Sequence, residues 1–359
     1  MASDKVERVP NPRGDLGLTI VQDMVELTHD RIAHAGMENA KRNLSVQSAG
    51  KSIADLPEMQ IGGTDAAIVI AAGPSVARNG LIQKIKDSNF DGAIIACDSA
   101  LRLCLAHGLI PDLIVTLDTH ARRIVRWFGD PELSSNIHID NDDYFRRQDY
   151  DGAFAEELRT NDQVISLCNQ YGKNIRIALS TSSSESVVSR VRDIGMEIYW
   201  WNPMYDDPAV KGGLTRELYD MNRLPCINAG GNVGTCCWMI AHAVLGKSHV
   251  AVVGTDFAYY DGTPYEKTQY YHEAVNLFGE DDLDRVYIPV FNPHLNQRFY
   301  TDPACMWYRE AFLELAADAD CTTYNCTEGG ILFGDNIRWS SIEEFVALGA
   351  GGGAMDGFV

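Results

Sequence analysis

The sequence predicts an α/β fold of the Rossmann-like type, in which a mostly parallel sheet lies between two layers of helices. Residues 66–75 and 250–262 are apolar, partly β-branched runs that end in a glycine followed by a small or acidic residue. A buried parallel strand delivers a tight polar loop to the carboxyl edge of its sheet in this way. From Asp65 onward, short apolar runs alternate with helical periods, which is the pattern of βαβ units.

Eight strands are expected from these apolar runs. They are Ala66–Ala71, Gly92–Cys97, Leu113–Leu117, Gln163–Cys168, Ile175–Leu179, Glu197–Trp201, His249–Val253 and Thr322–Asn325. Between them, apolar residues at helical spacing predict helices at Leu81–Lys86, Ser99–Ala106, Ser184–Ile194, Val233–Leu245 and Pro303–Ala317.

The chain of 359 residues divides into three expected regions. Residues 1–62 carry an amphipathic pattern and are expected to form a helical N-terminal extension. Residues 63–337 are expected to form a domain that binds a nucleotide or sugar nucleotide, and residues 338–359 a C-terminal tail. Within the main domain, residues 261–301 are aromatic and lack a clear period, which predicts a lid or a binding loop.

The charge balance disfavours nucleic acid as a partner. The chain has 50 acidic and 30 basic residues, and its formal charge of −20 would repel a phosphate backbone. No charge-free apolar run is long enough to cross a bilayer and the first residues lack an apolar signal core, so we expect a cytoplasmic protein. The nine cysteines lack a metal-type spacing, so we expect reduced structural thiols and assign no metal site.

Polar loops follow the first three strands of the main domain. Gly73, Pro74 and Ser75 form a turn whose backbone N–H groups can face a phosphate, although such turns also occur in ordinary strand-to-helix connections. The turn departs from the G-x-G-x-x-G pattern, which disfavours NAD. Asp98 with Ser99 follows the next strand, either as a ligand contact or as a helix cap. Asp118 follows the third, as a ligand contact or a solvated carboxylate.

Later loops add a second set of candidates for the same pocket. A glycine-rich loop before an apolar helix offers backbone N–H groups to an anion, and tyrosine hydroxyls after a strand can hold a leaving phosphate or simply pack. The residues concerned are Gly231 and Asn232 before the helix, Asp256, Tyr259 and Tyr265 after strand His249–Val253, and Thr327 and Glu328 after the last strand.

Five motifs in this order resemble the motility accessory factor family, which consists of glycosyltransferase-like proteins implicated in attaching nonulosonic acids to flagellin. The same domain family includes the 6-hydroxymethylpterin diphosphokinases. The motifs are Ala72-Gly73-Pro74-Ser75, Gly108-Leu109-Ile110-Pro111-Asp112 with Asp118, Gly230-Gly231-Asn232-Val233, Gly254-Thr255-Asp256-Phe257-Ala258-Tyr259 with Asp261-Gly262, and Thr327-Glu328-Gly329-Gly330.

The resemblance implies a glycosyltransferase that takes a sugar from a nucleotide-activated donor. A more distant likeness to bacterial sialyltransferases implies a CMP-type donor whose phosphate lies beside Tyr259 and Tyr265. Those enzymes have a catalytic histidine where this chain has Tyr300-Thr301, so His294 and His272 are the alternative bases. The expected partners are the nucleotide-activated sugar and an acceptor protein or glycan, and an oligomer is compatible with the sequence.

Two other functions stay open at this point. One is diphosphate transfer from ATP to a pterin, with Mg²⁺ held near Asp98, Asp118 and Asp256, although the third loop is less acidic than in those kinases. The other is a module that binds a nucleotide or a sugar without catalysis. The CMP-type donor needs no further cofactor, whereas the kinase alternative requires Mg²⁺.

Overall fold

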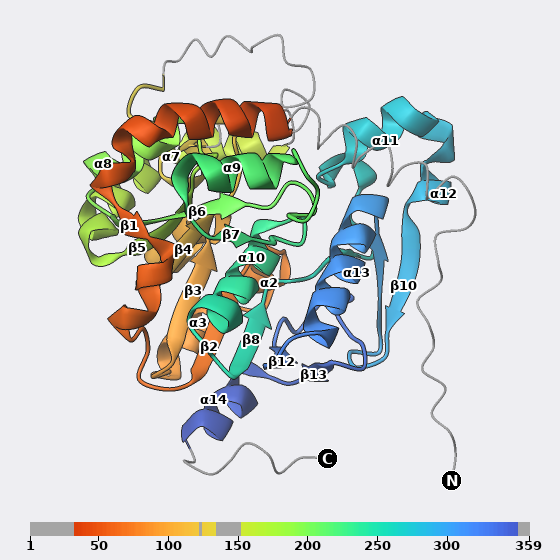
Figure 1. Cartoon of the computed structure of the whole chain (residues 1–359). Helices are drawn as coiled ribbons and strands as arrows, with labels where there is room; N and C mark the ends of the chain where they lie inside the picture. The colour runs from red at the N-terminus through yellow and green to blue at the C-terminus, as the bar shows by residue number, and fades with distance from the viewer. Residues whose placement is uncertain (1–31, 122–123, 134–151, 351–359) are drawn as a thin grey trace.

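A ten-stranded parallel sheet organises the computed structural model, which describes residues 32–121, 124–133 and 152–350 (Figure 1). Its order is β1-β6-β5-β4-β3-β2-β8-β12-β13, and β7 pairs with β6. The α/β fold expected from the sequence is therefore confirmed. The strands are β1 (Lys51–Ser52), β2 (Ala66–Ile70), β3 (Ala93–Cys97), β4 (Leu113–Thr116), β5 (Arg176–Ser180), β6 (Glu197–Pro203), β7 (Cys226–Ile227), β8 (His249–Val253), β12 (Thr322–Asn325) and β13 (Ile337–Trp339).

The strand order reverses between β2 and β8. From β2 the chain adds β3, β4, β5 and β6 on one side, then returns to place β8 on the other side of β2. The register of this pair runs from Ala66 opposite His249 to Ile70 opposite Val253. All ten of these residues except His249 are buried, because helices cover both faces of the sheet.

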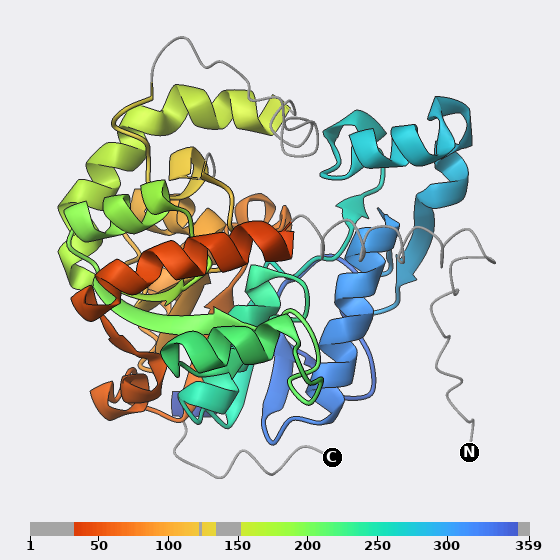
Figure 2. The ribbon, with the colours of Figure 1, turned by 45° about the horizontal axis from the view of Figure 1, so that its top comes forward.

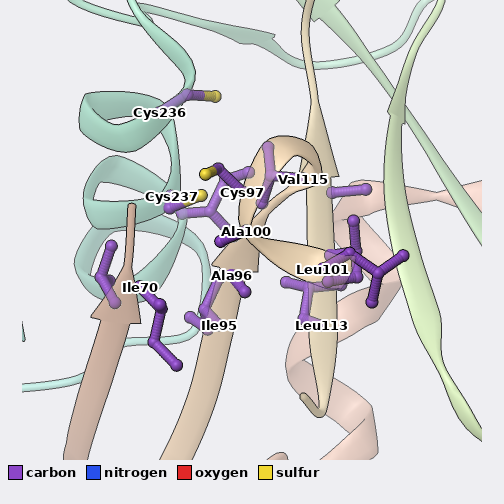
Figure 3. Packing of buried hydrophobic residues seen from close by; sticks show 14 of the residues in the cluster. Ile70, Ile95, Ala96, Cys97, Ala100, Leu101, Leu113, Val115, Cys236 and Cys237 are labelled. Carbon is purple, nitrogen blue, oxygen red and sulfur yellow. The ribbon is translucent and has the colours of Figure 1, made fainter. Parts of the chain in front are cut away.

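Helices fill the connections between the strands. They are α2 (Ser75–Arg78), α3 (Leu81–Asp87), α4 (Leu101–Ala106), α5 (Ile124–Trp127), α7 (Gly152–Tyr171), α8 (Glu185–Asp193), α9 (Leu214–Asn222), α10 (Val233–Met239), α13 (Pro303–Ala317) and α14 (Ile342–Ala350). The apolar side of α10 packs against β2, β3 and β4. Figure 3 shows Cys237 of α10 pointing toward Cys97 at the end of β3, and burial raises the pKa of both thiols, which keeps them protonated.

One predicted strand is wrong. Residues Gln163–Cys168 lie inside the 20-residue helix α7 and not in the sheet. Val164 and Cys168, which are four residues apart, are both buried, so the apolar side chains of this run share one helical face. Short apolar runs fit a strand and a helix equally well, and only the length of the surrounding helix distinguishes the two.

A second lobe follows β8, where the sequence predicted an irregular lid or binding loop at residues 261–301. It contains helices α11 (Tyr271–Phe278) and α12 (Leu283–Val286) and a three-stranded antiparallel sheet of β9 (Tyr259–Tyr260), β10 (Ile288–Asn292) and β11 (Gln297–Thr301). Figure 2 shows this lobe beside the main domain, joined to it through α13. The residues expected as a loop are thus largely ordered into helices and strands.

A helix over residues 32–43 belongs to the expected N-terminal extension, whose residues 1–31 lie outside the described part of the chain. Asn39 donates its side-chain N–H groups to the carbonyl oxygens of Thr119 and Ser182, at 3.0 and 2.9 Å. Asn43, one turn later, donates to those of Thr181 and Ser183, both at 2.8 Å. The helix therefore fastens the loops that follow β4 and β5.

The described residues after 336 pack on the main domain. Ile337 and Trp339 belong to β13, so the boundary expected at residue 338 falls within a strand of the sheet. Ile342 and Phe345 of α14 are fully buried in the main core. In the described part of the chain, no helix has both the length and the apolar character that a bilayer crossing requires.

Replacing Asn43 tests how firmly the helix over residues 32–43 is fastened. We expect Asn43→Ala to lower the free energy of unfolding by about 1–3 kcal/mol, because two buried carbonyl groups lose their donors. Urea denaturation measures the change. The control Gln83→Ala, at an exposed position of α3, should cost less than about 0.5 kcal/mol; equal losses in the two variants would contradict the role of Asn43.

Candidate functional site at the carboxyl edge of the sheet

The loops after β2 and β8 lie side by side at the point where the strand order reverses. Ala71 N–H donates to the Val253 carbonyl oxygen at 2.8 Å, and Gly73 N–H donates to that of Gly254 at 2.9 Å. In open α/β sheets the crevice outside the carboxyl ends of two such strands is where ligands bind. The two segments from which the fold was predicted therefore flank the expected binding crevice.

Ser75 and Asp256 connect these two loops directly. The Ser75 hydroxyl donates to Asp256 Oδ2 at 2.7 Å, and Ser75 N–H donates to Oδ1 at 3.3 Å. A Cβ atom at Gly73 would collide with the same carboxylate and with the Gly254 carbonyl oxygen. The backbone N–H groups of Gly73 and Ser75, which were expected to face a phosphate, thus donate within the protein.

Asp256 is almost completely buried, with 3% of its surface exposed. Burial raises the pKa of its carboxyl to about 7, and the two hydrogen bonds from Ser75 act in the opposite direction. The Asp256 carbonyl oxygen accepts from Ile331 N–H at 2.8 Å. Asp256 is therefore held on both its side chain and its backbone, and it acts as the connector between β8, α2 and the loop after β12.

The ends of β3 and β4 carry polar atoms that lack partners. Asp98 is 2% exposed; its Oδ1 accepts from Ser99 N–H at 2.7 Å, whereas its Oδ2 meets no hydrogen-bond partner in the described residues. Burial raises the pKa of Asp98 to about 7 and nearby Asp118 adds to the rise, whereas the Thr116 hydroxyl and Ser99, which lie close to the carboxyl, act in the opposite direction. The hydroxyls of Thr116 and Thr119 are also buried without a partner among these residues. Such groups mark places for a ligand or ordered water.

Buried hydroxyls without a hydrogen-bond partner in the described residues also occur along the edge at β5 and β8. Ser183 follows β5 and Thr255 follows β8, and each has a buried hydroxyl with no hydrogen-bond partner in the parts of the chain that are described. We call the five residues Asp98, Thr116, Thr119, Ser183 and Thr255 the edge row. Unsatisfied polar groups are costly in a protein interior, so their concentration along one edge indicates a binding surface.

The glycine-rich loop before α10 lies near this edge. A Cβ atom at Gly234 would be 3.2 Å from that of Ala71, which places the start of α10 against the end of β2. Asn232 caps α10 by accepting from Thr235 N–H at 2.9 Å. Gly231 has φ of +81° and fits closely against the rings of Trp307 and Tyr308, where a side chain would collide. Packing accounts for both residues, and their contact with an anion stays a prediction.

Tyr259 and Tyr265 belong to the second lobe, and their hydroxyls already have acceptors. Tyr259 donates to Asp302 Oδ2 at 2.8 Å, and Tyr265 donates to Asp284 Oδ1 at 2.9 Å. The Tyr265 ring also stacks on Tyr287 with 4.2 Å between centroids. Burial raises the pKa of Tyr259 well above its ordinary range and that of Tyr265 to about 12, so both stay neutral.

The candidate histidines are also placed in the second lobe. His272 is in α11 and contacts the ring of its neighbour Tyr271. His294 lies in the turn between β10 and β11 and stacks on Trp339 of β13, with 4.8 Å between ring centroids. Burial lowers the pKa of His294. Neither histidine directly follows a strand of the main sheet, and their role as base stays a prediction.

Thr327 and Glu328 follow β12 and serve the packing of the edge. Thr327 Oγ1 accepts from Thr255 N–H at 3.3 Å. Glu328 has φ of +53° and forms an ion pair with Lys84 at 2.7 Å. The structure thus places Ser75, Asp256 and Thr327 together beside Thr255, and it places Asp98 near Asp118.

Sequence reasoning assigned no role to the hydroxyls of the edge row. Thr116 and Thr119 stand in the quoted motif around Asp118, and Ser183 follows a run of hydroxyl residues, Ser180-Thr181-Ser182. The sequence feature that could have identified these residues is a hydroxyl side chain at or soon after the end of a buried strand. Within residues 32–121, 124–133 and 152–350, no three His, Cys, Asp or Glu side chains gather as they would around a metal ion.

A hollow of about 560 Å³ lies at the opposite edge of the sheet, where β3 and β4 begin. Its lining includes Gly62, Phe90, Asp91, Ile110 and Asp112. Burial raises the pKa of Asp112, whose carboxylate accepts from Ile94 N–H at 2.8 Å. None of the predicted site residues lines this hollow, so substitutions in it can serve as controls for substitutions at the carboxyl edge.

Titration of Asp256 should appear in the pH dependence of stability. Its pKa is about 7 in the folded protein, whereas an unfolded aspartate titrates near about 4. The unfolded chain therefore loses this proton first, and the contribution of Asp256 to stability falls as pH rises from about 4 to about 7. In Asp256→Asn this fall is absent, so the melting temperature of the variant should rise relative to wild type across that interval.

Thermal melts at half-unit pH steps measure this difference. The control Asp261→Asn, in the turn after β9, should keep the wild-type dependence. Parallel curves for wild type and Asp256→Asn from pH 4 to pH 8 would show that Asp256 does not titrate as described.

Two comparisons with known proteins found similarities. Residues 34–134 match a family model described as MptE-like, 6-hydroxymethylpterin diphosphokinase MptE-like. A solved structure described as the MAf glycosyltransferase from Magnetospirillum magneticum AMB-1 is similar over 93% of this chain, with 14% sequence identity and a TM-score of 0.47. The chain spans about half the length of that structure, since the similarity covers 50% of it. A search of curated proteins found no match.

The matched segment contains strands β1 to β4 of the main sheet and most of the helix over residues 32–43. It includes Gly73, Ser75, Asp98 and Asp118, whereas Asp256 and the whole second lobe lie beyond it. The resemblance expected from the sequence is thus confirmed for residues 34–134, which are similar to the MptE-like family.

Proposed function

We propose that this chain is a glycosyltransferase-like enzyme that binds a nucleotide-activated sugar at the carboxyl edge of its main sheet. The sugar, a nonulosonic or sialic-type acid carried by CMP, is transferred to a hydroxyl of a protein or glycan. The observation that carries the proposal is the edge row: five buried side chains, each with an oxygen that has no hydrogen-bond partner in the described residues, along the edge from β5 to β8. The likeness of residues 34–134 to a family named after a phosphate-transferring enzyme adds support.

The chemistry of the edge row suits a nucleoside with its sugar hydroxyls. Asp98 offers a buried oxygen whose pKa is near neutrality, so it can accept or donate a hydrogen bond. The hydroxyls of Thr116 and Thr119 donate and accept beside it. Because these groups are fixed and buried, each one left unpaired by a wrong ligand would weaken binding, which provides selectivity.

A general base is needed to take the proton from the acceptor hydroxyl. His120 lies in the loop after β4, and its backbone N–H donates to Asp118 Oδ1 at 2.8 Å. It is therefore better placed for this role than His294 or His272, which belong to the second lobe. We include His120 in the proposal as the base, with Asp118 fixing the loop that carries it.

Nucleotide binding is the direct test of this proposal. We expect CMP to raise the melting temperature of the wild-type protein, because a ligand that binds only the folded state stabilises it. Asp98→Asn and Thr116→Val should each weaken CMP binding roughly 10-fold, the effect of one lost hydrogen bond to a buried group. Calorimetric titration gives the dissociation constants.

The matched control is Asp91→Asn, an exposed carboxylate in the hollow at the other edge of the sheet. It should bind CMP as wild type does. If Asp91→Asn weakens binding and the two edge variants do not, the nucleotide site is not at the carboxyl edge.

A second candidate function is diphosphate transfer from ATP to the hydroxymethyl group of a pterin. It is favoured by the name of the family that residues 34–134 match and by the two carboxylates at the ends of β3 and β4 within that segment. Asp98 has an unpartnered buried oxygen of the type that Mg²⁺ prefers. Asp256, expected as a third ligand, instead accepts hydrogen bonds from Ser75 on both oxygens.

The two candidates differ in the product that each forms. Incubation with ATP, Mg²⁺ and 6-hydroxymethyl-7,8-dihydropterin yields AMP and a pterin diphosphate if the kinase alternative holds. We expect no AMP from the wild-type protein above the level of Asp98→Asn. AMP release that Asp98→Asn abolishes would replace the glycosyltransferase proposal with the kinase.

A further inference from the structure

Among the described residues of this strongly acidic protein, Arg78 is an arginine without an ion-pair partner. It is the last residue of α2, the short helix that follows Gly73, Pro74 and Ser75, and it is exposed. Among the described residues it forms no ion pair and its side chain donates no hydrogen bond. Its guanidinium lies over the ring of Tyr260 in β9, 4.1 Å from the centroid. This contact leaves the five N–H donors of the fork available.

Tyr260 brings a second donor to the same place. The side chain is 7% exposed, and its buried hydroxyl has no hydrogen-bond partner in the described part of the chain. A Cβ atom at Gly329 would be 2.7 Å from this hydroxyl and 3.2 Å from Asp256 Oδ1, so the hydroxyl lies at the junction of β8, β9 and the loop after β12. Burial raises the pKa of Tyr260, which keeps the proton on the hydroxyl, while the nearby Asn79 side chain and the charge of Arg78 act in the opposite direction.

Two carboxylates that lie near Tyr260, those of Asp256 and Glu328, are already engaged by other residues. Asp256 accepts both hydrogen bonds from Ser75, and Glu328 pairs with Lys84 at 2.7 Å. Asn79, the residue after Arg78, donates its side-chain N–H to the Glu328 carbonyl oxygen at 2.8 Å. These contacts fix the position of α2 against the loop after β12, and they leave the positive charge of Arg78 without a neutralising partner.

We propose that Arg78 and Tyr260 form an oxyanion subsite that receives the phosphate or the carboxylate of the ligand bound at the carboxyl edge. The inference rests on the proposed function and assigns residues to the charged part of its substrate. A guanidinium held over an aromatic ring presents the donors of its planar group from a defined position, which suits the two oxygens of a phosphate or carboxylate. The subsite also gives the chain, with its formal charge of −20, a local attraction for an anionic donor.

Three variants separate the contributions of the charge, the planar guanidinium and the tyrosine hydroxyl, and a fourth is the control. Arg78→Gln removes the charge, Arg78→Lys keeps the charge but not the planar fork, and Tyr260→Phe removes only the hydroxyl. The matched control is Arg192→Gln on α8, an exposed arginine on the far side of the strand order, beside β5 and β6. Circular dichroism and thermal melts without ligand check that each variant is folded.

Calorimetric titrations with CMP, cytidine and inorganic pyrophosphate, at two salt concentrations, provide the readout. For Arg78→Gln we expect CMP and pyrophosphate to bind roughly 10- to 100-fold more weakly while cytidine is unaffected, since only a charge-assisted contact is lost. Arg78→Lys should recover part of the affinity, and Tyr260→Phe should lose a few-fold. Arg192→Gln should match wild type.

The two sources of the oxyanion are distinguished by a titration with the free nonulosonic acid. Loss of its binding in Arg78→Gln, with CMP unaffected, assigns the subsite to the carboxylate and supports the inference. Loss for CMP with the free acid unaffected assigns it to the phosphate and supports it equally. Unchanged affinity of Arg78→Gln for all these ligands would overturn the inference.

The inference and the proposed function can fail separately. If wild type binds pyrophosphate through Arg78 but binds no nucleotide, the oxyanion subsite stands and the proposed function falls. If wild type binds CMP and the free nonulosonic acid, and Arg78→Gln binds these ligands and pyrophosphate equally well, the proposed function stands and the subsite falls. If the wild-type protein binds none of these ligands, both are overturned.

Discussion

The hydrogen bonds from Ser75 to Asp256 hold together the two halves of the carboxyl edge. They join the loop after β2 to the loop after β8, where the strand order reverses. The approach is possible only because Gly73, Gly254 and Gly330 lack side chains, each at a place where a Cβ atom would collide with a neighbouring backbone or carboxylate. The buried Asp256 carboxylate, which accepts two hydrogen bonds from Ser75, thus fixes the position of α2 and of Arg78 at its end.

These hydrogen bonds change the role that can be assigned to the N–H groups of the glycine-proline-serine turn. The sequence of the turn is typical of a phosphate-binding site, because glycine and serine commonly offer their N–H groups to anions. In this protein those groups donate to Gly254 and Asp256, so an anion must find its donors elsewhere. Polar groups that lack a partner in the described residues remain in the edge row and in Arg78 with Tyr260, and each set has residues on both sides of the reversal. A nucleotide that spans the crevice can contact both.

Much of the main domain was predictable, because its strands are short apolar runs with a helix between most of them. Seven of the eight expected strands occur within a residue or two of their predicted ends, and helix Pro303–Ala317 occurs as predicted. The strand predicted at Gln163–Cys168 is wrong because a short apolar run fits a strand and a helix equally well. The order within residues 261–301 escaped prediction for another reason: the helices and strands of a small lobe bury few residues each, so their period is weak. Strands of two or three residues, such as β1, β7 and β13, are fixed by pairing with a neighbour rather than by their own sequence.

The location of the site residues at the carboxyl edge could be predicted, but their hydrogen-bond partners could not. The sequence indicates which residues follow strands, and Asp98, Asp118 and Asp256 do lie at the carboxyl edge. It does not indicate which of them are already engaged: Tyr259 and Tyr265 stand at a spacing that suggests phosphate contacts, but their hydroxyls donate to Asp302 and Asp284. Buried groups that lack partners, such as Thr116 and Tyr260, are recognised only when every neighbour is in place.

Hydrogen–deuterium exchange with and without CMP tests the central claim, that the ligand binds across the carboxyl edge, most directly. The account predicts slower exchange in peptides that cover residues 71–79, 97–101, 116–121 and 254–260, with no change around the hollow at the other edge. Protection confined to residues 60–63 and 90–94, which line that hollow, would contradict it.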